Sequence, residues 1–118
     1  PTIAPAPGAT APTRDPAETV ARFYSLVAAH RFDEAAALWT SRMRREYPPA
    51  GNIDGRFAKT TRIDIQALDI RSQSLAGRSA VVYVDLIEYR ESEAPRRYRG
   101  TWDMVLSGSG WLMDEPHF

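Results

Sequence analysis

The sequence lacks several residue types on which large classes of proteins depend. It has no cysteine, so disulfides, thiolate nucleophiles, zinc fingers and iron–sulfur clusters are excluded. Histidine occurs only at His30 and His117, which leaves little imidazole for acid–base catalysis or metal binding. Basic and acidic side chains balance at 15 each, so no excess of positive charge indicates a nucleic-acid partner.

What remains is the composition of one globular domain preceded by a linker. Hydrophobic residues make up 43% of the 118 residues, enough for a core. Residues 1–14 are different, because proline and alanine supply eight of the first 12 positions. Such a segment buries too little surface to offset its ordering, so we expect an extended linker or tail followed by a single domain over residues 15–118. Linkers of this kind often follow a signal peptide or membrane anchor, and we expect membrane contact only through an anchor outside this sequence.

Two helices are predicted at the start of the domain. Asp15 is a good N-cap and precedes a proline, and apolar residues then recur at three- and four-residue spacing, which predicts a helix over residues 16–29. Asp33 is a second N-cap, and residues 34–47 are predicted to form a second helix that ends at Pro48. A short helical turn around Ile53 and Phe57 is expected in the connection that follows.

From residue 62 the hydrophobic period changes to two, which predicts an antiparallel meander and an α+β fold. The alternation slips near Ala67, where we expect a β-bulge. The longest predicted strand, residues 80–89, is apolar on both faces and is expected to be covered on both sides. A third strand over residues 97–106 and a glycine-containing hairpin lead to a last strand that starts at Trp111.

Two sequence motifs resemble a known family. The run ARFYSLVAAHRFDEAAALW over residues 21–39 and the pair RGTWDMVL and GWLMD over residues 99–114 resemble the nuclear transport factor 2-like superfamily, which includes ketosteroid-isomerase-like and polyketide-cyclase-like proteins. The resemblance implies N-terminal helices packed in a strongly curved antiparallel sheet, a cone with a pocket at its wide end. It also implies a non-catalytic bacterial branch that works outside the cytoplasm, tethered to a membrane protein or lipoprotein.

The isomerase branch of that superfamily uses an aspartate base, a tyrosine and a protonated carboxylic acid. Aligned on the shared motifs, the tyrosine position falls on Phe23, the base on Tyr47 and the second acid on Trp102, and none of these residues carries the required group. A shift of one residue would bring in Tyr24 or Asp103. We therefore expect no isomerase activity.

Other acid–base candidates are few. Asp85 lies among apolar neighbours, where burial would raise its pKa and suit it to proton transfer; the alternative is a carboxylate paired with one of the many arginines. His117 would line the open mouth of the cone or be a mobile terminal side chain. Asp114, Glu115 and His117 are a poor basis for a metal site, so we expect neither a metal nor a cofactor.

Aromatic side chains supply the remaining route to function. A pocket for an apolar or planar ligand would be lined by five aromatic residues and one acid: Tyr24, Trp39, Phe57, Tyr83, Trp102 and Asp85. The alternative is that these rings fill the core, where we also expect Trp111. We predict a non-enzymatic domain that binds a small ligand or a protein. The alternatives are a homodimerising module that associates through the sheet face, or a small-molecule isomerase, cyclase or dehydratase that uses Asp85.

Overall fold

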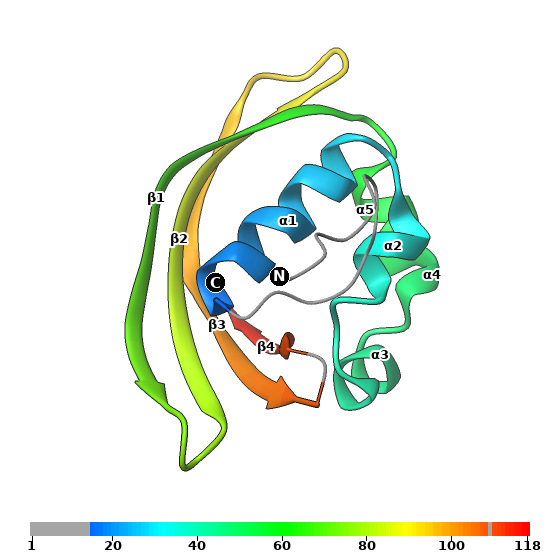
Figure 1. The fold of residues 1–118 in the computed structure, drawn as a ribbon. Coiled ribbons are helices and arrows are strands. Elements are labelled where there is room, and N and C mark those ends of the chain that lie inside the picture. The colour runs from blue at the N-terminus through cyan, green and yellow to red at the C-terminus, as the bar shows by residue number, and fades with distance from the viewer. Residues whose placement is uncertain (1–14, 109) are drawn as a thin grey trace, which may run out of the picture.

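The structure is a computed structural model that describes residues 15–108 and 110–118. In this part of the chain five helices are followed by four strands, so the predicted α+β class is confirmed (Figure 1). The predicted linker over residues 1–14 lies outside the described residues. None of the described helices combines the length and the apolar character that crossing a membrane would require.

The first helix, α1, spans Pro16–Ala28, close to the predicted bounds. Asp15 caps it by accepting a hydrogen bond from the backbone N–H of Ala17 at 2.8 Å. The stripe at three- and four-residue spacing is buried, with Val20 and Val27 fully inaccessible to solvent. This stripe faces the sheet, and α1 therefore supplies the centre of the core.

The prediction of one continuous second helix is wrong. The chain instead forms α2 (Phe32–Ala36) and α3 (Ser41–Glu46), because the backbone between them leaves the helix to pair with the last strand. Met113 donates its N–H to the carbonyl of Leu38 at 2.8 Å and accepts the N–H of Thr40 at 2.9 Å. Thr40 then caps α3 through its side chain. Helical periodicity did not reveal this, because Leu38 and Trp39, which the helical pattern assigns to the buried stripe, are buried in the observed conformation as well.

Two short helices complete the helical part. They are α4 (Pro49–Asn52) and α5 (Asp54–Phe57), which confirms the helical turn expected in this connection. Ile53 and Phe57 anchor it, since both side chains are buried.

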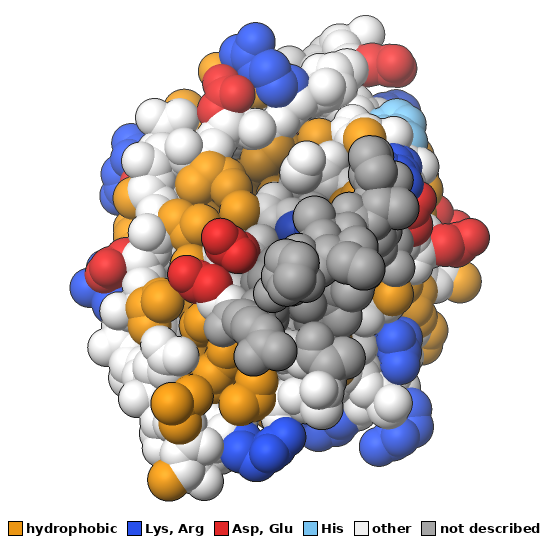
Figure 2. All heavy atoms as spheres, viewed as in Figure 1, with side chains coloured by type: hydrophobic (Ala, Val, Ile, Leu, Met, Phe, Trp, Pro, Cys, Tyr) orange, Lys and Arg blue, Asp and Glu red, His pale blue; other side chains and the backbone are white. Residues whose placement is uncertain are grey.

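The four strands form one open antiparallel sheet in the order β1-β2-β3-β4, which curves around α1 (Figure 1). Their bounds are Thr60–Ser74, Ser79–Arg90, Arg96–Ser107 and Gly110–His117. The predicted bulge is confirmed by a register shift between Ile65 and Ala67. On the side of the molecule where β1 and β2 lie in Figure 1, Figure 2 shows hydrophobic side chains that reach the surface.

The inner face of β2 is buried, as predicted, whereas the outward side chains between Val81 and Tyr89 are half-buried, except for Asp85, which is buried. Every second side chain from Ala80 to Glu88 is buried under the helices. The outward side chains Tyr83 and Tyr89 are only half-buried, and they lie under the guanidinium groups of Arg71 and Arg62 at 4.5 and 4.1 Å. Arginines from β1 thus shield these outward tyrosines.

Candidate functional site

A hollow of about 260 Å³ lies between the inner face of the sheet and the helices α1 and α5. Aromatic and aliphatic side chains dominate its wall, together with one ion pair. The lining residues are Tyr24, Arg56, Phe57, Ile63, Leu86, Glu88, Tyr98, Trp102 and Phe118. An apolar hollow with a few converging polar groups is the usual form of a small-molecule site.

The ion pair in this wall joins Glu88 of β2 to Arg56 of α5. The guanidinium donates to both carboxylate oxygens, at 2.9 and 2.8 Å, and Thr60 also donates to the carboxylate. The Glu88 side chain is 1% exposed and the Arg56 side chain 38% exposed. Burial by itself would raise the pKa of Glu88, but the hydrogen bonds from Arg56 and Thr60 outweigh it and hold the pKa below its ordinary value. Glu88 is therefore charged at neutral pH.

A second polar contact links Tyr24 of α1 to Trp102 of β3. The indole N–H of Trp102 donates to the phenol oxygen of Tyr24 at 3.0 Å, and both side chains are buried. Burial raises the pKa of the Tyr24 phenol above its ordinary value, so the hydroxyl keeps its proton. Within the described part of the chain no acceptor for that proton is found. Tyr24 thus brings an unused hydrogen-bond donor to the wall of the hollow.

Phe118 closes one side of the hollow. Its ring lies edge-on to Trp102, with the ring centroids 5.9 Å apart. The ring also covers Gly100 of β3, where a Cβ would come within 2.6 Å of it and within 2.5 Å of the His117 carbonyl oxygen. The position therefore needs a residue without a side chain.

A second hollow of about 170 Å³ adjoins the first and shares Tyr24, Arg56, Phe57 and Trp102 with it. Trp39 is part of its wall. The indole nitrogen of Trp39 is buried and has no hydrogen-bond partner among the residues that the structure describes.

The structure brings together four of the six predicted pocket residues. Tyr24, Phe57 and Trp102 line both hollows, and Trp39 lines the second. Tyr83 and Asp85 point to the opposite face of the sheet and line neither. Alternation along β2 places residues 83 and 85 opposite to residues 82 and 84, which are buried.

Asp85 also departs from the expectation that its pKa is raised. Arg97 donates to its two carboxylate oxygens at 2.8 and 2.6 Å, and Arg99 lies 3.4 Å away. The hydrogen bond from Arg97 is the main cause that lowers the pKa of Asp85 below its ordinary value. The alternative prediction, a carboxylate paired with arginine, is confirmed.

Sequence reasoning missed Arg56, Glu88, Tyr98 and Phe118. Glu88 could have been predicted from the sequence, because it continues the inward-facing series of residues 82, 84 and 86 on the same strand. The partner, Arg56, lies 32 positions away in a short helix, and no local pattern connects the two.

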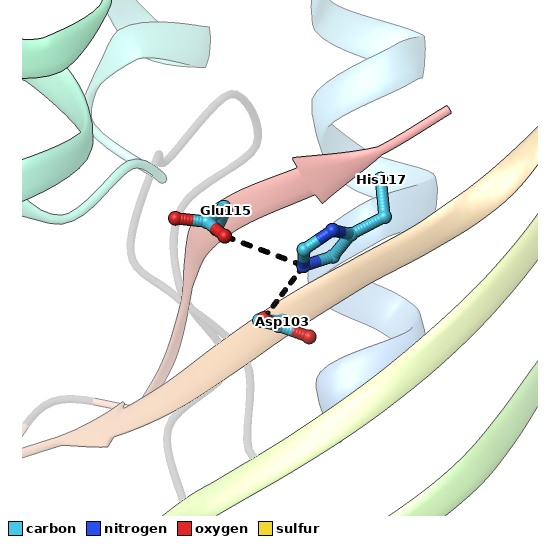
Figure 3. Close-up of side chains that lie close together, drawn as sticks. All are labelled: Asp103, Glu115 and His117. Atoms are coloured by element: carbon cyan, nitrogen blue, oxygen red, sulfur yellow. Dashed lines mark hydrogen bonds and ion pairs between the residues drawn. The ribbon is translucent and has the colours of Figure 1, made fainter.

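His117 does not line the hollow, which corrects one of its two predicted alternatives, a place at the mouth of the cone. It lies on the outer face of the sheet with Asp103 and Glu115 (Figure 3). Its Nε2 is 2.8 Å from Asp103 Oδ2 and 3.4 Å from Glu115 Oε2. The hydrogen bond to Asp103 raises the pKa of His117 above its ordinary value. Asp114, which the sequence grouped with these residues, instead accepts hydrogen bonds from Thr40 at 2.7 Å and Arg42 at 3.1 Å.

Comparison with known proteins gives structural neighbours only. No family model matches the chain, and no curated protein matches it. A solution structure of RPA3114, a SEC-C motif containing protein from Rhodopseudomonas palustris, is similar with a TM-score of 0.65 at 15% identity, over 92% of this chain and 79% of that one. The intermembrane space region of the chloroplast protein ARC6 is similar with a TM-score of 0.58 at 18% identity, over 89% and 96% of the two chains. At these identities the likeness concerns the fold alone.

Proposed function

We propose that this domain binds a small, largely apolar molecule in the hollow between the sheet and the helices. The observation that carries the proposal is the Tyr24 hydroxyl, whose oxygen is held by Trp102 while its proton has no acceptor among the described residues. A buried donor without a partner is costly, and a ligand acceptor in the hollow would satisfy it.

The wall defines the chemistry of the ligand. Its rings and aliphatic side chains suit a flat apolar body, and the volume of about 260 Å³ is near the lower end for small-molecule sites. A carbonyl oxygen on that body would accept the Tyr24 proton. Arg56 is already paired with Glu88, so we expect no preference for a strongly anionic ligand.

We also propose the family and the setting that the sequence predicts. The order of helices followed by a curved four-stranded meander supports membership of the nuclear transport factor 2-like superfamily, with the hollow as the pocket of its cone. The linker composition supports a tethered, extracytoplasmic location. Fusion of the full gene product to a reporter that folds only outside the cytoplasm tests the location, and reporter activity is expected.

The binding proposal is tested with two matched probes, 1-indanone and indane, which differ by one carbonyl. Titration of the ¹⁵N-labelled protein should shift the indole N–H signal of Trp102 with both probes, and 1-indanone should bind more tightly. In Tyr24→Phe that preference should disappear. Tyr83→Phe is the matched control, since Tyr83 faces away from the hollow, and it should bind both probes like the wild type. Absence of shifts at Trp102 in the wild type would refute the proposal.

The two alternatives are weaker on structural grounds. Asp85 lies on the face opposite to the hollow and is held by Arg97, so it is badly placed to act as an acid or base there. A homodimer through the outer sheet face would have to accommodate the guanidinium groups of Arg71, Arg97 and Arg99. Light scattering separates the dimer from the monomeric binder, and we expect a monomer.

A further inference from the structure

A cluster of three potential metal ligands lies on the outer face of the sheet, away from the proposed pocket. Asp103, Glu115 and His117 each present one ligand atom, and these atoms lie within 4.8 Å of one another (Figure 3). We propose that the three side chains bind a divalent transition-metal ion such as Zn²⁺. The proposal does not depend on the pocket or its ligand.

The distances in the cluster suit such an ion. Bonds of about 2.0–2.1 Å in a tetrahedral site place neighbouring ligand atoms about 3.4 Å apart. The Nε2 atom of His117 lies 3.4 Å from Glu115 Oε2 and 2.8 Å from Asp103 Oδ2. The oxygens of Asp103 and Glu115 lie within 4.8 Å of each other, so seating the ion would require side-chain rotations that separate His117 from Asp103 and bring the three atoms to equal spacing. Imidazole nitrogen and carboxylate oxygen are both common zinc ligands, and three protein ligands leave one position for water.

The strands themselves bring these residues together. Asp103 of β3 and Glu115 of β4 are register partners, and His117 follows two residues later on the same face of β4. The three ligands therefore come from two hydrogen-bonded strands, whose backbone is less mobile than a loop. Such a scaffold holds the ligand atoms in place before the ion binds.

A further side chain orients one ligand from outside the cluster. Arg42 of α3 lies 3.3 Å from Oε1 of Glu115, which leaves Oε2 as the atom that faces His117. Partners of this kind commonly fix the orientation of metal ligands. The two carboxylates also balance the charge of a divalent ion, whereas His117 alone does not neutralise them both.

Binding of the ion would also hold the end of the chain against β3. His117 points to the outer face, and the next residue, Phe118, lines the inner hollow. The ion would thus fix the residue next to Phe118, and the indole signal of Trp102, whose ring contacts Phe118, should report this.

The test is calorimetric titration of the full chain with Zn²⁺, with NMR of the histidine ring protons as a second readout. We expect one equivalent to bind and to shift the ring signals of His117 and not those of His30. Asp103→Asn, Glu115→Gln and His117→Gln should each weaken binding by roughly tenfold or more. His30→Gln is the matched control, because it removes the other histidine, and it should bind like the wild type.

Each of the other outcomes contradicts the proposal. Zinc binding that persists in all three ligand variants, or that is lost in His30→Gln, would place the ion elsewhere. Absence of saturable binding to a wild-type protein with a normal unfolding transition would show that the cluster is an ion-pair network only. Circular dichroism spectra of the variants that match the wild type establish that loss of binding is not loss of fold.

Discussion

The indole N–H of Trp102 donates a hydrogen bond to the phenol oxygen of Tyr24 at 3.0 Å, across 78 positions of sequence. The bond joins the third strand to the first helix inside the core, where both rings are buried. The ring of Phe23 lies beside both of them, with centroids 5.2 Å from Tyr24 and 6.0 Å from Trp102. One polar contact inside an aromatic cluster therefore fixes how the helix sits on the sheet.

Tyr24→Phe should lower the free energy of unfolding by about 1–3 kcal/mol. The substitution keeps the ring but leaves the buried N–H of Trp102 without its acceptor. Chemical denaturation measures the change, and Tyr83→Phe on the outer face is the control, with an expected loss below about 0.5 kcal/mol. A loss of that small size in Tyr24→Phe would show that water replaces the phenol oxygen.

Gly100→Ala should destabilise the domain and displace Phe118 from the hollow. The new Cβ would come within 2.5 Å of the His117 carbonyl oxygen, a backbone atom that has little freedom to move. We expect a loss on the order of 1–3 kcal/mol, as for other overpacked sites. Gly55→Ala is the matched control, since no atom lies within 4 Å of its added Cβ, and it should be neutral or slightly stabilising. Equal melting temperatures for the two variants would contradict the close packing at Gly100.

Local patterns were sufficient to locate the first helix and the strands, because the helix cap and the alternation of apolar residues are both visible within a short stretch of sequence. The capping residue Asp15 and the bulge before Ala67 are examples of such local information. Local patterns were insufficient at residues 38–40. There the backbone pairs with Met113 instead of continuing the helix, and this pairing depends on a strand that lies more than 70 positions away.

The same limit applies to the candidate site. The aromatic residues Tyr24, Phe57 and Trp102 were found because large rings commonly pack together where helices lie on a sheet. Asp85 was misjudged because its apolar neighbours in sequence lie on the other face, while its true neighbour Arg97 comes from the adjacent strand. Side-chain pairing across strands depends on register, which single-strand alternation does not define.

Trp39→Ala and Trp111→Ala should each cost about 3–5 kcal/mol. Both rings are in the core, with 4% and 1% of their surface exposed, as the sequence predicted. Trp39 stacks on Phe23 at 5.7 Å, and Trp111 is among the largest fully buried side chains. Urea denaturation measures the loss, and Leu75→Ala, at a residue 70% exposed, is the control with little expected change. A loss of less than about 1 kcal/mol at either tryptophan would mean that its ring is not part of the core.

Glu88→Gln should lower the free energy of unfolding at pH 7 by about 1–3 kcal/mol, because it weakens the hydrogen bonds from Arg56 and Thr60 to a buried group. This loss of stability is smaller than for a fully buried ion pair, because the Arg56 side chain is 38% exposed and water can solvate part of its guanidinium group when the carboxylate is removed.

The pH dependence of that difference tests the charge of Glu88 directly. The pKa of Glu88 in the folded protein lies below its ordinary value, so the unfolded chain takes up the proton first as pH falls. The stabilisation by the carboxylate is therefore complete above the pKa of the unfolded chain, about 4.3, and is lost as pH falls through the folded pKa. The stability difference between wild type and Glu88→Gln should be constant from about pH 7 to pH 5 and shrink below about pH 4. Glu91→Gln, at an exposed residue beyond β2, is the control and should match the wild type at neutral pH. A difference that stays constant down to about pH 3 would mean that the contribution of Glu88 comes from its shape and packing and not from its charge.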